Sequence, residues 1–209
     1  MEKQTHSLIL RGISWQTYKA LMTDVGDNRL WRMTYERGVL EIRMPREEHE
    51  EPKELLGDFI TVMVDELGWE MRKLGSLTLE REDLNRAAEP DACFYIQNEA
   101  IVRGRKITLG QDPPPDLVIE SDYTHSSIYK HSLYAALGVP EIWRYYQNRL
   151  GVYRLNGEEY IESRESLAFP FLPIGEIPDF VRQSQKIGQR STVRQFRARI
   201  REILGTDNG

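Results

Sequence analysis

The fold is decided by one short stretch of the chain, PDLVIE at residues 115–120. Its three apolar residues stand between Asp116 and Glu120, and two further prolines precede it. A short apolar run bounded by chain-breaking residues is typical of a strand that is buried on both faces. The stretch therefore predicts a central strand of a β-sheet with a carboxylate at each end.

The N-terminal segment combines a helix pattern with a hairpin pattern. Ser14 is a good N-cap for a short helix at residues 15–21. Two strand patterns follow, at residues 31–35 and 39–44, and a Gly-bearing turn separates them. The sequence therefore predicts a helix followed by an N-terminal β-hairpin.

The longest predicted helix has apolar residues at helical spacing from Leu55, with Pro52 in its first turn and Gly68 at its end. The other predicted elements are strands at residues 69–74, 77–81, 91–97, 141–146, 149–155 and 159–163 and a helix at residues 126–137. This order favours an α/β (α+β) fold with a mixed β-sheet core flanked by helices. We expect a single domain over residues 1–209.

The composition fits a soluble globular protein. The chain has 209 residues, of which 40% are hydrophobic and 29% charged, and its formal net charge is −5. The single cysteine, Cys93, excludes an intramolecular disulfide, and no apolar stretch approaches the roughly 20 residues that span a bilayer. We therefore expect a cytoplasmic protein without a membrane partner. The acidic total argues against bulk electrostatic binding of nucleic acid.

The net charge hides an uneven distribution. The stretch from Arg182 to Arg201 holds seven basic residues and no acidic one. Apolar residues recur at helical spacing within it, which predicts a basic amphipathic helix at about residues 191–204, capped by Ser191 or Thr192. Two interpretations stay open. The arginines are either the solvated face of a docking helix or a surface that contacts nucleic-acid phosphates through Arg194, Arg197 and Arg201.

Two carboxylates at the ends of predicted neighbouring strands are the strongest candidates for chemistry. Asp91 opens one apolar strand and Glu120 closes the central one. Mg²⁺ is commonly held by one or two carboxylates, with water and substrate phosphate completing its coordination. The alternative is that the two side chains cap turns or pair with basic residues.

Neighbouring carboxylates differ in how well they could join this pair. Asp116 lies four strand residues from Glu120, about 13 Å away, which is too far to share one ion. Asp122 follows Glu120 by two residues on the same face, so it is a candidate third metal ligand. Gly-rich phosphate loops, a Gly-x-Ser-x-Gly motif and paired cysteines are missing from the sequence.

Two further groups of residues are weaker candidates. His49 and Glu50, just before Pro52, could supply a general base or a metal ligand, although an acidic run at a helix start also complements the helix dipole. The basic residues Arg103, Arg105 and Lys106 stand in a loop between the two acid-bearing strands. They could contact a phosphate backbone, and a solvated loop is the equal alternative.

Several motifs together resemble one family. They are EPDA at residues 89–92, PDLVIE at 115–120, Ser126, Ser127, Lys130, YAALGVPEIW at 134–143, YERGVLE at 35–41 and His49. Their order and spacing are similar to those of the restriction-endonuclease-like family often called Uma, which is abundant in cyanobacteria. The similarity runs from about Trp15 to the basic C-terminal helix.

The resemblance implies the PD-(D/E)XK nuclease fold and metal-dependent hydrolysis of DNA. Asp91 and Glu120 match the family's metal ligands, for Mg²⁺ or Mn²⁺, and the backbone carbonyl after Glu120 is a third donor. The superfamily's lysine normally stands two residues after the acid, where this chain has Asp122. Lys130 instead matches a lysine that the family places on the following helix, from which a long ammonium can reach back to the site.

The resemblance leaves two functions open. The first is a DNA endonuclease with Asp91, Glu120 and Lys130 at its centre, acting as a homodimer because cutting two strands favours two sites. The second is a nucleic-acid- or protein-binding module that kept the fold and lost catalysis. The displaced lysine and the acidic charge favour the module, and the intact acid pair favours the enzyme.

Overall fold

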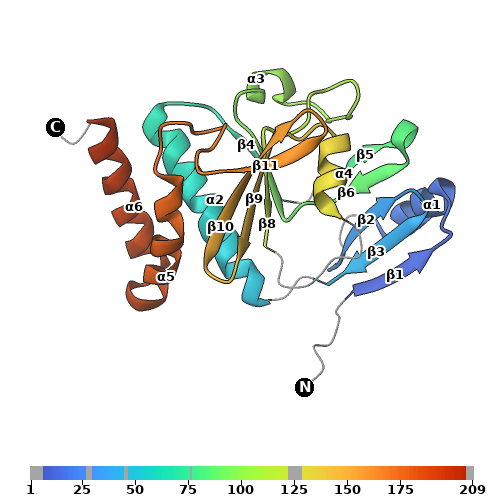
Figure 1. Cartoon of the computed structure of the whole chain (residues 1–209), viewed down its shortest axis with the longest axis horizontal. Coiled ribbons are helices and arrows are strands. Elements are labelled where there is room, and N and C mark those ends of the chain that lie inside the picture. Colours follow the sequence, from blue (N-terminus) through green and yellow to red (C-terminus); the bar gives the residue numbers. More distant parts are fainter. Residues whose placement is uncertain (1–6, 27–29, 45–46, 76, 122–128, 206–209) are drawn as a thin grey trace.

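Two β-sheets with helices around them make up the molecule (Figure 1). The structure is a computed structural model that describes residues 7–26, 30–44, 47–75, 77–121 and 129–205, apart from the side chains of residues 47–50. Helix α4 (Lys130–Ala136) packs against one strand of each sheet. The mixed α/β architecture predicted from the sequence is confirmed.

The larger sheet has six strands in the order β11-β10-β9-β8-β7-β4. These are β4 (Arg72–Leu74), β7 (Ala92–Tyr95), β8 (Leu117–Glu120), β9 (Glu141–Tyr146), β10 (Arg149–Asn156) and β11 (Glu159–Ser163). Strands β8 and β9 are parallel and the other pairs antiparallel, so α4 provides the crossover that a parallel pair needs. The PDLVIE strand is β8, which lies inside the sheet and is buried along its whole length.

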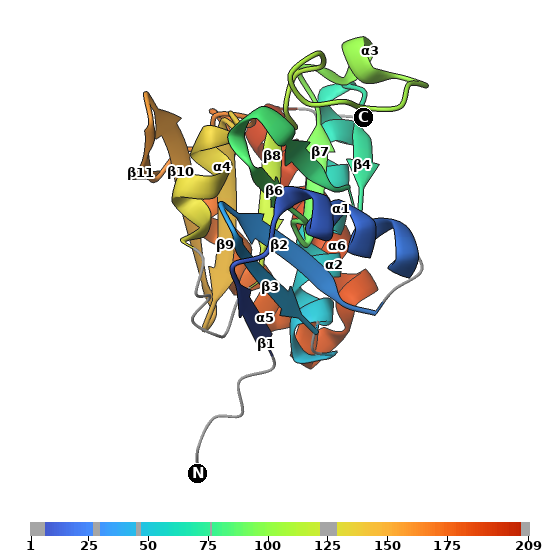
Figure 2. The same cartoon turned by 90° about the vertical axis from the view of Figure 1, so that its right-hand side faces the viewer.

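The smaller sheet has five strands in the order β1-β3-β2-β6-β5, all antiparallel. They are β1 (Ser7–Arg11), β2 (Arg32–Glu36), β3 (Val39–Arg43), β5 (Leu79–Arg81) and β6 (Arg86–Ala88), with the short helix η1 (Glu82–Leu84) between the last two. Helix α1 (Trp15–Val25) covers this sheet, as Figure 2 shows. The rings of Trp15, Tyr18 and Tyr35 pack together there, with centroids 5.0–5.5 Å apart.

Three helices cover one face of the larger sheet, at the left of Figure 1. They are α2 (Glu47–Leu67), α5 (Ile177–Ile187) and α6 (Gln189–Leu204). Their main aromatic contact joins Phe59 of α2 to Phe196 of α6, with ring centroids 4.4 Å apart. The short helices α3 (Glu99–Val102) and η2 (Ile174–Glu176) lie in connections. No helix in the described ranges is long and apolar enough to cross a membrane.

The predicted elements match the structure apart from some of their bounds and caps. The helix capped by Ser14 and the hairpin are confirmed, and the helix runs on to Val25. Helix α2 begins at Glu47, so Pro52 is inside it and not in its first turn. The basic helix starts at Gln189, so the expected caps Ser191 and Thr192 were wrong.

Strands β1 and β6 and helix α5 were not predicted. The first two are short strands with little apolar alternation, and they gain their hydrogen bonds from neighbours in the sheet rather than from local preference. The expectation of one domain over residues 1–209 stays a prediction.

Asp116, at the start of the central strand, has a structural role. Its Oδ2 accepts hydrogen bonds from the backbone N–H groups of Ile96 (2.7 Å) and Asn98 (3.0 Å), and its Oδ1 accepts one from Asn98 Nδ2 (2.6 Å). The carboxylate is 6% exposed and caps the turn after β7. This agrees with its exclusion from a shared metal site.

We expect Asp116→Ala to lower the free energy of unfolding by about 3 kcal/mol, because the buried N–H of Ile96 and the part-buried N–H of Asn98 lose a charged acceptor. Urea denaturation measures this loss. Asp83→Ala is the control, since Asp83 is exposed and pairs only locally with Arg81. Equal effects of the two substitutions would contradict the capping role.

Candidate active site

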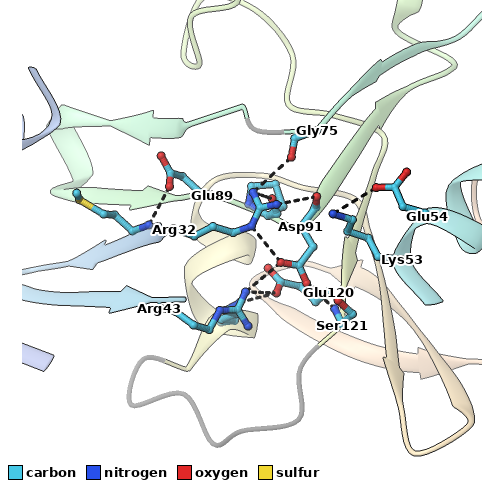
Figure 3. A network of polar contacts seen from close by, with 12 residues as sticks. Arg32, Arg43, Lys53, Glu54, Gly75, Glu89, Asp91, Glu120 and Ser121 are labelled. Atoms are coloured by element: carbon cyan, nitrogen blue, oxygen red, sulfur yellow. Dashed lines mark hydrogen bonds and ion pairs between the residues drawn. The ribbon is translucent and has the colours of Figure 1, made fainter. Parts of the chain in front are cut away.

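The acid pair predicted from the sequence meets where the two sheets approach each other (Figure 3). In the antiparallel pair of β7 and β8, Ala92 is opposite Ile119. Asp91 precedes Ala92 and Glu120 follows Ile119, so continuing this register brings the two carboxylates level. Both residues are buried, at 5% and 3% exposed.

Asp91 is surrounded by donors from three segments. Its Oδ1 lies 3.1 Å from Arg43 Nη2 and 3.3 Å from Arg32 Nε. Its Oδ2 accepts hydrogen bonds from the backbone N–H of Ser121 (2.8 Å) and from Ser121 Oγ (2.7 Å). Both carboxylate oxygens are therefore fixed in direction.

Burial by itself would raise the pKa of the Asp91 carboxyl. The charges of Arg43, Lys130 and Arg32, together with the Ser121 N–H, outweigh burial and lower the pKa from 3.8 to about 2. Asp91 is consequently ionised throughout the physiological range, as a metal ligand must be.

Glu120 receives contacts from helix α4 on both of its oxygens. Lys130 Nζ pairs with Oε2, and the Tyr134 hydroxyl donates a hydrogen bond to Oε1. Arg43 Nη2 lies 3.6 Å from the same Oε2. Burial, and then the charge of Glu120, raise the pKa of Tyr134 well above its ordinary value, so the phenol stays protonated and acts as a donor.

Arg32 also holds the turn that carries Asp91. Its guanidinium donates to the backbone carbonyls of Pro90 (3.1 Å), Asp91 (3.4 Å) and Gly75 (3.4 Å). The preceding residue, Glu89, accepts a hydrogen bond from the backbone N–H of Met33 at 2.8 Å. Strand β2 of the smaller sheet therefore holds the Glu89–Asp91 segment, through the Arg32 side chain and the Met33 backbone.

The donor set fits a hard divalent cation. Arg43 Nη2 is 3.1 Å from Asp91 Oδ1 and 3.6 Å from Glu120 Oε2. The distance between these two oxygens therefore cannot exceed the sum of the two contacts. Mg²⁺ holds its ligands at about 2.0–2.1 Å, so two oxygens on one ion lie within about 4 Å of each other, and the limit set by the Arg43 contacts is compatible with that spacing. In the part of the chain that the structure describes, no third His, Cys, Asp or Glu completes a ligand cluster. Two carboxylates with water and phosphate oxygens are the arrangement that Mg²⁺ accepts.

For three of the other predicted site residues, the structure describes no side chain. Asp122 lies outside the described residues, and His49 and Glu50 lie in the first turns of α2, where only the backbone is described. Their roles stay predictions. Lys53, also on α2, was not predicted; it is buried, and its Nζ lies 3.3 Å from Glu54 Oε1, its labelled partner in Figure 3.

The basic loop after α3 is bound to its own surroundings. Arg103 pairs with Glu99, and the guanidinium of Arg105 pairs with Asp112. Lys106 is exposed. Contact of these three residues with a phosphate backbone stays a prediction.

Some of the arginines of α6 pair with α2 carboxylates. Arg197 pairs with Asp65 (2.9 Å) and with Glu66, and Arg201 Nε lies 2.8 Å from Glu66. Arg194 contacts only Ser191 among the interactions that the structure records for it. These pairs support the docking interpretation for Arg197 and Arg201, whereas phosphate contact by the three arginines stays a prediction.

Sequence reasoning missed Arg32, Arg43 and Tyr134. Tyr134 follows Lys130 by four residues, so both lie on one helix face, and this spacing could have identified it. The two arginines stand directly opposite each other on β2 and β3. Their proximity to Asp91 depends on how the sheets pack, and no local pattern encodes that.

Comparison with known proteins gives a family and a structural resemblance. A model of the Uma2 family, described as "Putative restriction endonuclease", matches residues 15–180. A solved structure that resembles the chain is that of "a putative nuclease belonging to DUF820" from Anabaena variabilis, which is 15% identical, with a TM-score of 0.45. The alignment covers 77% of this chain and 90% of that one. No curated protein matches the chain.

The ion pairs of Asp91 should make stability depend on acidity. Because its pKa falls from 3.8 in the unfolded chain to about 2 in the folded one, its stabilising contribution is complete above about pH 4. That contribution, about 2 kcal/mol, is lost as the pH falls through about 2. Urea denaturation at several pH values should show a shallower acid dependence for Asp91→Asn than for wild type. Asp24→Asn, at an exposed position on α1, should keep the wild-type dependence; a wild-type slope in Asp91→Asn would refute the assignment.

The α6 pairs predict a difference between two arginines on one helix. Arg197→Ala should lower the free energy of unfolding by about 1 kcal/mol, since it breaks two partly exposed ion pairs to α2. Arg194→Ala should change it by less than about 0.5 kcal/mol. Thermal and urea unfolding measure both values, and indistinguishable variants would rule out a docking role for Arg197.

Proposed function

Because the chain belongs to the Uma2 family of restriction-endonuclease-like proteins, we propose that it is a divalent-metal-dependent endonuclease that hydrolyses DNA phosphodiester bonds. The observation that carries the proposal is that the carboxylates of Asp91 and Glu120, from adjacent strands, both lie close to the same guanidinium nitrogen, Arg43 Nη2. Two buried, level carboxylates that share a positive charge form a place where a metal ion can be held.

Asp91 and Glu120 would hold Mg²⁺ or Mn²⁺, and the backbone carbonyl of Ser121 is the proposed third donor. Such an ion supplies Lewis-acid stabilisation of the phosphate and a water molecule of lowered pKa. The chain's own residues fix the direction of the carboxylates: Ser121 donates to Asp91, and Tyr134 donates to Glu120.

Lys130 is the residue we propose for stabilising the negative charge that develops on the phosphate. Its side chain is 14% exposed and its ammonium pairs with Glu120, although the residue starts a helix and does not stand two positions after the acid. The contact of Lys130 with Glu120 supports this proposal, because the family resemblance implies a lysine on the helix that follows the acid. A fixed ammonium at such a position acts electrostatically at the moment of cleavage.

The remaining parts of the proposal concern partners. We propose DNA as the substrate and a homodimer as the working form, because a duplex presents two strands related by a two-fold axis. We propose a cytoplasmic location, in keeping with the single buried cysteine.

One observation favours the alternative of a binding module without catalysis. Asp91 and Glu120 already pair with Arg32, Arg43 and Lys130, so their negative charge is offset without a metal ion. A module of this kind would bind nucleic acid or protein and leave it intact. Its binding to DNA would weaken with salt whether or not a divalent ion is present.

A plasmid-nicking assay with Mn²⁺ and Mg²⁺ tests the proposal. We expect wild-type protein to nick plasmid only with a divalent ion, and Asp91→Ala and Glu120→Ala to abolish nicking because a metal ligand is lost. Lys130→Ala should slow nicking by about 10²-fold, the typical cost of removing one transition-state donor, and Tyr134→Phe by about tenfold.

Lys186→Ala, at an exposed position on α5, is the matched control and should cleave like wild type. Cleavage that survives Asp91→Ala and Glu120→Ala would exclude this site. Salt-sensitive DNA retention without nicking under any divalent ion would establish the binding module instead.

A further inference from the structure

Two arginines stand opposite each other on the hairpin that faces the acid pair. In the antiparallel register of β2 and β3, Arg32 is the Cα partner of Arg43. Their side chains are 14% and 15% exposed. Like charges directly opposite each other on neighbouring strands destabilise a sheet, and burial increases that cost. The hairpin by itself gains nothing from this pair.

The two guanidinium groups converge on a single carboxylate oxygen. Arg32 Nε and Arg43 Nη2 lie 3.3 Å and 3.1 Å from Asp91 Oδ1. Their bonding differs otherwise, because Arg32 also donates to three backbone carbonyls and holds a turn. Arg43 instead lies between the two acids, through its 3.6 Å approach to Glu120 Oε2. Arg32 therefore holds the backbone next to Asp91, whereas Arg43 links the carboxylates of Asp91 and Glu120.

The bridging position of Arg43 is the one that a shared divalent ion needs. Ser121 holds Asp91 Oδ2 and Tyr134 holds Glu120 Oε1, so a cation bound to both acids would take the other two oxygens, Asp91 Oδ1 and Glu120 Oε2. These are the oxygens that Arg43 Nη2 contacts. Two positive groups cannot occupy one buried position between two carboxylates without strong repulsion. Binding of the ion and the Arg43 bridge are therefore competing states.

We propose that Arg43 closes the acid pair when no divalent ion is bound and, when an ion displaces it, becomes a binding group for the scissile phosphate. This inference rests on the proposed nuclease function. Among the described residues of this ion-pair network, Arg32, Arg43 and Lys130 exceed Asp91 and Glu120 by one positive charge. A released guanidinium therefore lies in a region of positive charge, where an anion with two free oxygens is the matching ligand.

The test is Mn²⁺ binding to purified protein without DNA, measured by calorimetry for wild type and Arg43→Gln. We expect the dissociation constant to fall about tenfold or more in Arg43→Gln, because the competing charge is gone. At saturating Mn²⁺, plasmid nicking by the same variant should be slower by about 10²-fold, because the phosphate loses a donor. Opposite changes in the two measurements are not expected of a residue with a purely structural role.

Arg86→Gln is the matched control. Arg86 lies on β6 of the same sheet, is 13% exposed and pairs with one carboxylate, Glu36, at 3.0 Å. It should bind Mn²⁺ and nick plasmid like wild type. Mn²⁺ binding in Arg43→Gln that is unchanged or weaker would overturn the competition, and unchanged nicking would overturn the phosphate role.

A measurement on wild-type protein covers the case in which Arg43→Gln does not fold. The side-chain ¹⁵Nε–H resonance of Arg43, assigned by its loss in Arg43→Lys, should shift when Mg²⁺ is added, whereas that of Arg86 should not. An Arg43 resonance that does not shift although Mg²⁺ binds to the protein would refute the inference.

If neither wild type nor Arg43→Gln binds Mn²⁺, both this inference and the proposed metal-dependent function are refuted. If wild type binds Mn²⁺ but cuts no DNA, the proposed nuclease and the phosphate role fail, and the calorimetric comparison still decides the competition.

Discussion

The neutralisation of two buried carboxylates is the constraint on which the arrangement of the two sheets depends. Asp91, just before β7, and Glu120, at the end of β8, lie level, and burying two carboxylate charges is costly without positive partners. The larger sheet and its helix α4 provide one cation, Lys130. The smaller sheet provides the other two, Arg32 and Arg43, so the contact between the sheets is also the charge balance of the site.

This constraint gives each layer a separate task. The helices α2, α5 and α6 bury one face of the larger sheet and hold β7 and β8 in place through apolar contacts. The smaller sheet has its own aromatic cluster around Tyr18 and Tyr35, so its hairpin is a stable support. Helix α4 is short and contacts strands of both sheets, and it presents Lys130 and Tyr134 to Glu120. Apolar packing thus positions a small polar centre that contributes little hydrophobic area of its own.

The sequence predicts what local pattern encodes and misses what packing decides. The PDLVIE strand, the helix capped by Ser14 and the hairpin follow from apolar periodicity and capping chemistry. The acid pair follows because strand ends carry side chains to one edge. Arg43 could not be identified in this way, since nothing in residues 39–44 indicates which surface the hairpin meets. The α6 arginines show the converse: their sequence suggests a free basic face, and only the tertiary structure reveals Asp65 and Glu66 opposite them.

The tight turn between β2 and β3 affects the acid pair, although it lies at the other end of the hairpin strands from Arg32 and Arg43. Arg37 and Gly38 both have positive φ, at 45° and 90°, and this turn sets which residues of β2 and β3 face each other. A slip of one residue would move every side chain of a strand to the opposite face of the sheet. Insertion of a residue at the turn would therefore rotate a guanidinium out of a site that belongs to another sheet. The backbone conformation of these two turn residues therefore sets which hairpin side chains reach Asp91 and Glu120.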